Sequence, residues 1–126
     1  MSHWCPAPGI YCTLVEGFLE IEAARAIISA SAVASAEKPI IGYHDWAAMS
    51  GYTSEARKVL MDYGSAETGK SIVRSHVLIS SPVVAIGVNV AATFVGGLTV
   101  YSNRSVFEGH RHRSILNATT AAGRES

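Results

Sequence analysis

Apolar residues gather along the chain in runs that glycine, proline and charged residues separate. Residues 11–21 hold short β-prone runs on either side of Gly17, which predicts one or two strands with a hairpin or bulge at that glycine. Residues 22–37 are rich in Ala, Ile, Ser and Val. Glu20 and Glu22 stand at the start of this run, where acidic groups favour the positive end of a helix dipole. We therefore expect a helix over residues 22–37.

The middle of the chain predicts a strand, a helix and a second strand. Residues 40–44 are apolar and β-prone, so we expect a buried strand there. Thr53 or Ser54 can cap a helix that runs to about Tyr63 with apolar residues on one face. A further β-prone run covers residues 72–79 and predicts the second strand.

A long stretch, residues 77–103, contains no charged residue and no histidine. Its length alone would permit a transmembrane helix. Pro82 near its start and the glycine pair that begins at Gly96 interrupt it. They favour a helix over residues 83–95 followed by a strand over residues 98–101. We therefore expect a soluble domain rather than a membrane span.

The two ends of the chain are expected to lie outside the folded domain. Residues 1–10 would form an N-terminal extension, and residues 11–108 would form the α/β domain. Asn103 or Ser105 can begin a short last helix. Residues 109–126 are polar, which predicts a flexible tail.

The predicted elements follow the order β(β)αβαβαβα, at spacings that suit right-handed crossovers. This order predicts a small single-domain α/β sandwich, in which helices pack on a mostly parallel sheet of about four or five strands. The length of 126 residues fits one domain and is too short for two separate cores.

Charge and hydropathy exclude two classes of protein. Only 16% of the residues are charged and 48% are hydrophobic, which excludes intrinsic disorder. The Lys and Arg residues number 10 and the Asp and Glu residues number 10, so the formal net charge is zero. Because nucleic acid normally demands a basic face, no nucleic-acid partner is expected.

Cysteine and histidine content predicts neither a disulfide scaffold nor a metal centre. Cys5 and Cys12 are too few for a scaffold, and the N-terminus lacks the cationic and apolar regions of a signal peptide. We expect reduced thiols in a cytoplasmic protein, with a local disulfide as the alternative. The cysteine spacing is unusual for zinc, and His110 and His112 lie in the expected tail, so we predict no metal and no cofactor.

Several local motifs, and their order along the chain, carry a family resemblance. They are Gly42-Tyr43-His44-Asp45-Trp46, Gly51-Tyr52-Thr53-Ser54-Glu55-Ala56-Arg57, His76-Val77-Leu78-Ile79, Val84-Ala85-Ile86-Gly87-Val88-Asn89-Val90-Ala91, and Gly96-Gly97-Leu98 with Tyr101-Ser102-Asn103-Arg104-Ser105-Val106-Phe107-Glu108. On these motifs the chain resembles the STAS superfamily of anti-anti-sigma-factor-like domains, and especially its bacterial STAS/lipid-transfer-like branch. The resemblance covers roughly residues 11–108 and implies an α/β regulatory domain that binds partners.

The resemblance also implies a modification site in the loop before the second helix. In such families this loop holds a Ser or Thr that a partner kinase phosphorylates, which switches partner binding. Thr53 and Ser54 occupy that place here. A phosphate at a helix N-terminus adds roughly −1.5 to −2 charge beside free backbone N–H groups and can rebuild a docking surface. The alternative is that Thr53 or Ser54 only caps the helix.

A nucleotide-binding pattern also occurs in the chain. Gly64, Gly69, Lys70 and Ser71 match G-x-x-x-x-G-K-[ST], in which the lysine contacts phosphates and the hydroxyl contacts Mg²⁺. A working P-loop follows a strand and opens a helix, whereas here the expected helix comes first and the expected strand second. We therefore expect a simple loop over residues 64–69 and keep nucleotide binding as the third hypothesis.

His44, Asp45 and Trp46 stand at the end of an expected strand and form the best-placed group for catalysis. Crevices of α/β folds lie at the carboxyl ends of strands, which is why this position matters. No nucleophile motif accompanies the three residues. The alternative, that they hold a loop in place, is favoured, and we expect no enzymatic activity.

The leading hypothesis is a non-enzymatic regulatory or protein-interaction domain that self-associates through an apolar surface. Val84, Ile86, Val88 and Phe94, on the helix expected over residues 83–95, would supply that surface. The alternative is a binding module for a lipid or another apolar ligand beneath the same helix.

Overall fold

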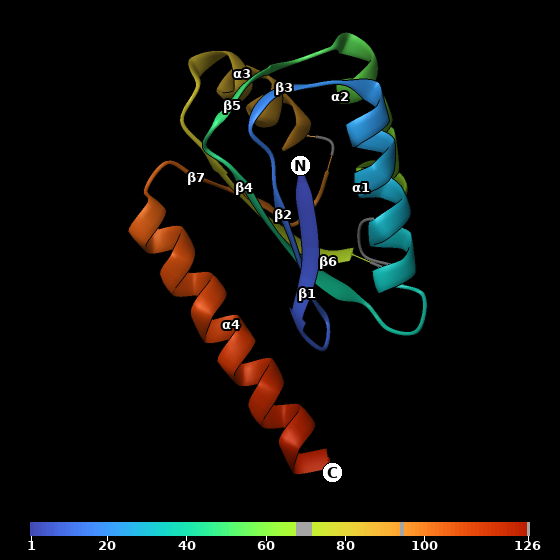
Figure 1. Ribbon diagram of the computed structural model, residues 1–126, viewed down its shortest axis with the longest axis vertical. Helices are drawn as coiled ribbons and strands as arrows, with labels where there is room; N and C mark the ends of the chain where they lie inside the picture. The colour runs from blue at the N-terminus through green and yellow to red at the C-terminus, as the bar shows by residue number, and fades with distance from the viewer. Residues whose placement is uncertain (68–71, 94, 126) are drawn as a thin grey trace.

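The chain folds around a mostly parallel β-sheet that has helices on both of its faces (Figure 1). A computed structural model describes residues 1–67, 72–93 and 95–125. The elements of the first half are β1 (Ser2–Ala7), β2 (Ile10–Leu14), β3 (Gly17–Leu19), α1 (Ile21–Ala34), β4 (Ile40–Trp46) and β5 (Met49–Tyr52). Those of the second half are α2 (Ser54–Glu67), β6 (Ile72–Ile79), α3 (Pro82–Ala91), β7 (Leu98–Tyr101) and α4 (Arg104–Glu125).

The main sheet of the described residues has five strands, in the order β1-β2-β4-β6-β7. β1 runs antiparallel to β2, and the other neighbouring strands of this sheet are parallel. β3 and β5 form a separate parallel pair, and β5 contacts α3. The predicted small α/β sandwich with a mostly parallel sheet is therefore confirmed.

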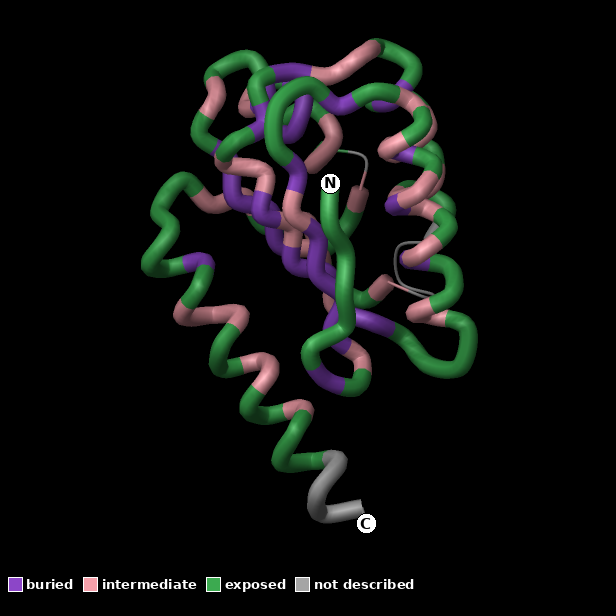
Figure 2. The backbone as a smooth tube through the Cα atoms, in the orientation of Figure 1, coloured by how far each residue is buried: buried purple, intermediate pink, exposed green. Residues whose placement is uncertain are grey.

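The two faces of the sheet carry separate cores. α1, α2 and α3 cover one face, and α4 crosses the other (Figure 1). The first core contains the buried residues Val15, Leu19, Ala24, Ile27, Met49, Ala56, Val77, Ile79, Val84 and Val88. The second core contains Ala7, Ile10, Cys12, Tyr43, Leu78 and Phe107. Buried positions run along the central strands, while the outer sides of the helices are exposed (Figure 2).

Side chains cap α2, α3 and α4 at their N-termini, and in α4 the cap is Asn103 Oδ1, which accepts the backbone N–H of Val106 at 3.1 Å. Thr53 Oγ1 accepts the backbone N–H of Ala56 at 3.0 Å where α2 begins. Ser81 Oγ accepts the backbone N–H of Val84 at 3.5 Å, and Pro82 occupies the first turn of α3. These bonds satisfy N–H groups that a helix start leaves without an intrahelical partner. The helix starts expected near Thr53 and Pro82 agree with the structure.

The flexible tail predicted over residues 109–126 is wrong for its described part, because α4 continues through it. Phe107, Ile115 and Ala118 recur at helical spacing and pack together against the second core. Polar residues between these positions conceal the apolar stripe when the segment is judged by composition. Only the start of this helix, next to Asn103, agrees with the sequence prediction.

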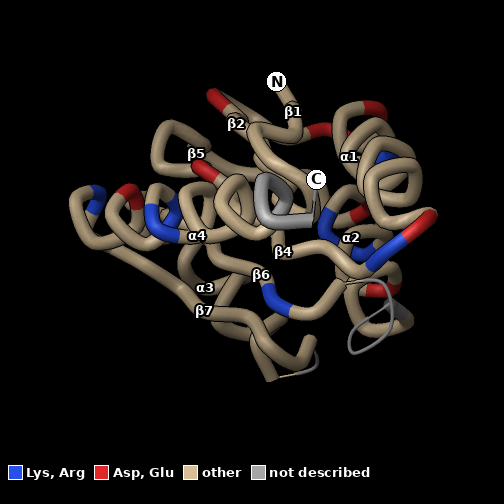
Figure 3. Tube along the Cα trace, turned by 90° about the horizontal axis from the view of Figure 1, so that it is seen from below, with Lys and Arg blue, Asp and Glu red and all other residues tan. Residues whose placement is uncertain are grey.

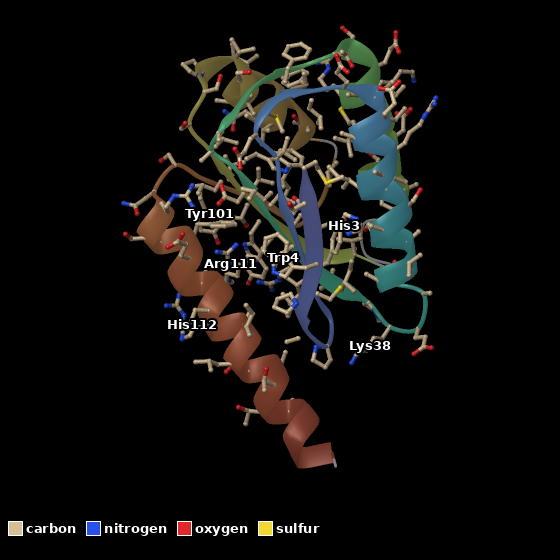
Figure 4. The ribbon with its side chains drawn as sticks, viewed as in Figure 1. His3, Trp4, Lys38, Tyr101, Arg111 and His112 are labelled. Atoms are coloured by element: carbon tan, nitrogen blue, oxygen red, sulfur yellow. The ribbon has the colours of Figure 1, made fainter. Side chains whose placement is uncertain are left out.

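The N-terminal extension predicted over residues 1–10 is also wrong, because β1 belongs to the main sheet. Trp4 pairs with Cys12 of β2, and Gly9, with φ of 78°, turns the chain between the two strands. His3 points toward α1 and Trp4 points toward α4, which is the alternation of a strand (Figure 4). Residues 1–10 show no local sequence pattern typical of a strand. The segment is a strand because its backbone pairs with β2.

Several other elements differ from the sequence predictions, and α1 ends at Ala34 rather than at residue 37. β5 was not expected, and α2 continues through Gly64 to Glu67 where a loop was expected. α3 ends at Ala91, so it is shorter than the helix predicted over residues 83–95. Among the described residues, no helix combines the length and the apolar character that a membrane crossing requires.

Charged residues of both signs occur along α1, α2 and α4 (Figure 3). Lys58 Nζ and Asp62 Oδ2 lie 3.1 Å apart on α2, and Arg104 Nη1 and Glu108 Oε1 lie 3.2 Å apart on α4. Exposed pairs of this kind stabilise a helix by only about 0.3–0.5 kcal/mol each. These two exposed pairs therefore contribute little to the stability of the fold.

Candidate functional site

A cavity of about 150 Å³ lies between the sheet and the three helices α1, α2 and α3. Its wall is mostly apolar and includes Leu19, Ile27, Met49, Leu60, Val77, Val84 and Val88. The wall also carries side chains with polar groups, namely Tyr11, Ser31, His44, Trp46, Tyr52, Arg57, Tyr63 and Ser75. A mostly apolar concave site with a few polar groups is the usual form of a small-molecule binding site.

Two glycines on the cavity wall leave room that a side chain would take. A Cβ atom on Gly87 of α3 would lie 1.9 Å from Oη of Tyr52. A Cβ atom on Gly42 of β4 would lie 2.8 Å from Nε2 of His44. The rings of Tyr52 and His44 thus lie directly over backbone that has no side chain of its own. This close approach explains why glycine occupies both positions.

Three polar side chains on the cavity side of the sheet form a chain of hydrogen bonds. Nε1 of Trp46 donates to Oγ1 of Thr13 at 3.1 Å, and the same oxygen lies 2.8 Å from Nδ1 of His44. Burial lowers the pKa of His44 to about 4, with a smaller contribution from the charge of His76. His44 is therefore neutral at pH 7.

His44 and Asp45 are not brought together, because consecutive strand residues point to opposite faces of a sheet. His44 lines the cavity, whereas Asp45 faces α4 and accepts two hydrogen bonds from Arg104, at 2.8 and 3.2 Å. Burial raises the pKa of Asp45, but the hydrogen bonds from Arg104 and from the backbone of Ala47 outweigh it, so the net shift is downward. Asp45 therefore anchors the start of α4, and Trp46 lies on the cavity side with His44.

A second polar cluster lies between the sheet and α4. The hydroxyl of Tyr43 bonds Nδ1 of His110 at 2.7 Å and also bonds Oγ of Ser114. Nδ1 of His76 lies 2.9 Å from the hydroxyl of Tyr101. The rings of Tyr43 and His76 are stacked, with centroids 4.6 Å apart. We call these five residues the α4 cluster.

Burial favours the neutral forms of His76 and Tyr43 within the α4 cluster. Burial lowers the pKa of His76 to about 4, and the nearby charges of His110 and Arg74 lower it further. Burial also raises the pKa of Tyr43. Neutral rings can stack closely and exchange hydrogen bonds without the cost of a buried charge. The cluster therefore serves to pack α4 on the sheet.

The two residues expected as phosphate acceptors occupy different positions. The hydroxyl of Thr53 is engaged as the α2 cap with Ala56. Ser54 is the first residue of α2 and is exposed. Of the two hydroxyls, that of Ser54 is the more open to a modifying enzyme.

The nucleotide-binding pattern does not have the structural setting of a P-loop in its described part. Gly64 lies inside α2 and lines the cavity, whereas the first glycine of a P-loop lies in a loop after a strand. Gly69, Lys70 and Ser71 lie outside the described residues.

The expected apolar surface of α3 is divided between the inside and the outside of the domain. Val84 and Val88 are buried and line the cavity, while Ile86 is 68% exposed. Phe94 lies outside the described residues. Within the described ranges, no group of three or more His, Cys, Asp or Glu side chains could hold a metal ion, and both Cys5 and Cys12 are free.

Sequence reasoning missed several residues of both sites, among them Thr13, Tyr43 and His76. Alternation along β4 was an available signal. Gly42, His44 and Trp46 share the cavity side, while the residues between them share the α4 side. The partners of these residues on other strands could not be inferred, because they depend on strand order.

Comparisons with known proteins place the fold. No family model matches the chain, and no curated protein matches it. An uncharacterised protein of the DUF3478 family from Shewanella loihica PV-4, described as having a SpoIIAA-like fold, is similar with a TM-score of 0.59 and 18% identity, over 87% of this chain and 83% of that one. The anti-sigma factor antagonist SpoIIAA in its unphosphorylated form is similar with a TM-score of 0.60 and 16% identity, over 90% of this chain and 98% of that one. The chain therefore has the SpoIIAA-like fold that the STAS resemblance implied.

Proposed function

We propose that this chain is a non-enzymatic binding domain that takes a small apolar molecule into the cavity beneath α3. The observation that carries the proposal is the cavity of about 150 Å³ with its mostly apolar wall. An engineered protein cavity of similar volume, lined by Leu, Ile and Phe, stays dry and binds benzene or xenon. A void of this kind gains dispersion contacts when an apolar molecule fills it.

The volume limits how much of a ligand this partly open cavity can surround. A cavity that matches benzene holds a molecule of roughly six to ten non-hydrogen atoms. A complete lipid is much larger, so we propose a small apolar molecule in place of a lipid. Binding without chemistry agrees with the separation of His44 and Asp45 onto opposite faces of β4.

The test is a titration of the protein with benzene, followed by NMR on the methyl groups of Val84 and Val88. We expect saturable shifts in the wild-type protein. Ala91→Phe places a ring at the cavity wall and should abolish them, because Ala91 lines the cavity. Val90→Phe is the matched control, since Val90 is the neighbouring residue, is 42% exposed and should leave binding intact. Absence of saturable shifts in the wild-type protein, or normal binding by Ala91→Phe, would contradict the proposal.

A second candidate function is regulation through protein contacts, including self-association. Val83, Ile86 and Val90 form an exposed apolar patch on the outer side of α3. The similarity to an anti-sigma factor antagonist supports a role of this class. Sedimentation velocity should show a concentration-dependent dimer that Ile86→Glu disrupts. Val106→Glu, at an exposed position of α4, is the control and should leave the dimer unchanged. A monomer at every concentration would remove self-association from this candidate.

Phosphorylation belongs to the same candidate, and the exposed hydroxyl of Ser54 is its proposed site. Intact-mass measurement of protein from its native host should show one added phosphate, which Ser54→Ala removes. Thr53→Val should keep the phosphate, because the Thr53 hydroxyl is engaged as the cap of α2. Phosphate that persists in Ser54→Ala would assign the modification to another residue.

A further inference from the structure

The hydrogen-bond chain from Trp46 through Thr13 to His44 determines which nitrogen of His44 carries the proton. An indole N–H can only donate, so Oγ1 of Thr13 acts as the acceptor of the 3.1 Å bond from Trp46. The same oxygen lies 2.8 Å from Nδ1 of His44. The remaining question is which of these two groups, the hydroxyl or the ring nitrogen, donates to the other.

The burial of Thr13 answers that question. Thr13 is 0% exposed, and its hydroxyl has no third hydrogen-bond partner among the described residues. If Nδ1 of His44 donated, the hydroxyl hydrogen of Thr13 would be buried without an acceptor, which is costly. The hydroxyl of Thr13 therefore donates to Nδ1, and the ring proton of the neutral His44 sits on Nε2.

Nε2 of His44 is the polar atom that this arrangement offers to the cavity. It lies over Gly42, another residue of the cavity wall, and it makes no hydrogen bond to a described residue. His44 is one of the residues that line the cavity, and its ring reaches the wall from β4. The Nε2–H group is thus an available donor in a wall that is otherwise mostly apolar.

We propose that the ligand of this cavity is a small, neutral, apolar molecule with one hydrogen-bond acceptor, such as an aryl ketone, which accepts from Nε2–H of His44. This inference rests on the proposed function and adds the chemical class of the ligand. A neutral acceptor suits a neutral donor, because a carboxylate against an uncharged ring would lose its hydration without gaining a counter-charge. Arg57, whose side chain also lines the cavity, is an exposed residue and so remains hydrated.

The first test measures the tautomer of His44 and requires no ligand. In protein labelled with ¹⁵N at histidine, two-bond ¹H–¹⁵N correlation spectra at pH 7 should show His44 protonated at Nε2 and unprotonated at Nδ1. Thr13→Ser keeps a hydroxyl and should keep this tautomer, whereas Thr13→Val removes the donor and should populate the other. A wild-type His44 protonated at Nδ1 would overturn the inference, and so would an unchanged tautomer in a folded Thr13→Val protein.

The second test compares two probes of nearly equal shape, acetophenone and isopropylbenzene. The carbonyl of acetophenone can accept from Nε2–H, so we expect it to bind roughly five- to tenfold more tightly than the hydrocarbon, the usual effect of one neutral hydrogen bond. His44→Phe should reduce that ratio to about one while both probes still bind. Equal affinities in the wild-type protein, or a preference that survives His44→Phe, would overturn the inference.

The outcomes separate this inference from the function on which it rests. If both probes bind the wild-type protein equally, the cavity takes apolar ligands but does not select an acceptor, and only the inference fails. If neither probe nor benzene binds, the proposed function fails and the inference falls with it. Tighter binding of benzoate than of acetophenone would assign recognition to Arg57 and overturn the neutral class.

Discussion

The two faces of the sheet are covered by helices that pack in different ways. On the face of α1, α2 and α3, mostly apolar side chains surround an open volume of about 150 Å³. On the α4 face, the rings of Tyr43, His76 and Phe107 pack closely, and hydroxyl and imidazole groups bond across the interface. The difference shows that packed rings hold α4 on one face, whereas the other face keeps an open volume beneath its helices.

The largest effect is expected from a change on the α4 face. Phe107 is 0% exposed and contacts the rings of both Tyr43 and Tyr101. Phe107→Ala should lower the free energy of unfolding by about 3–5 kcal/mol, measured by urea denaturation, because it leaves a cavity in a packed core. Val106→Ala, at the exposed neighbouring residue, should change it by less than about 0.5 kcal/mol. Equal effects of the two substitutions would show that α4 is not anchored by this ring.

Acid should affect both faces, through one histidine on each. Burial lowers the pKa of His44 and of His76 from 6.5 to about 4. Between these values the unfolded chain binds protons that the folded chain does not, so the stability present above pH 6.5 is lost as the pH falls toward 4. We expect each histidine to contribute a loss of up to about 3 kcal/mol in the free energy of unfolding across this window.

Single substitutions show which histidine, and therefore which face of the sheet, causes the loss of stability in acid. His76→Phe should reduce the pH dependence through the α4 face, and His44→Phe should reduce it through the cavity face. His112 is exposed and points away from the sheet (Figure 4). His112→Asn is therefore the control and should leave the pH dependence of stability unchanged. A pH profile that neither His76→Phe nor His44→Phe alters would assign the effect to other groups.

The smallest effect is expected from a methyl group added on the cavity face. Gly87→Ala would bring its Cβ to 1.9 Å from Oη of Tyr52, so the tyrosine ring must move. We expect a loss of about 1–2 kcal/mol in thermal denaturation, together with weaker benzene binding. Tyr52→Leu in the same chain should restore part of the stability, because it removes the clashing atom. A Gly87→Ala protein with unchanged stability and binding would show that the ring has free space to enter.

Some elements were predictable because their information is local. The strands expected over residues 72–79 and 98–101 coincide with β6 and β7. Each is an apolar, β-prone run with clear limits: Ser80 and Pro82 follow the first, and the glycine pair that begins at Gly96 precedes the second. The helix start near Thr53 followed from one side chain that can cap. The sequence also suggested an apolar ligand beneath α3 as an alternative; the cavity lies at that place, and binding there stays a prediction.

Other features depend on residues far apart in the chain. α4 is helical because Phe107 and Ile115 meet a core built from strands that lie far earlier in the sequence. The cavity volume depends on Gly42 and Gly87 reaching the same space from different elements. The tautomer of His44 depends on Thr13, which lies 31 positions away. Hydrophobic periodicity and motif spacing carry no information about such contacts between distant parts of the chain.

Side chains along β4 point alternately to the two faces of the sheet. This alternation also determines which mutations the fold can tolerate. Because neighbouring residues of this strand serve opposite faces, a substitution at Tyr43 or His44 alters one face and leaves the other intact. The insertion or deletion of one residue would exchange the two sets, turning His44 toward α4 and Tyr43 into the cavity. Variation in this strand is therefore confined to replacement, whereas a change of length, even by a single codon, would disable both faces together.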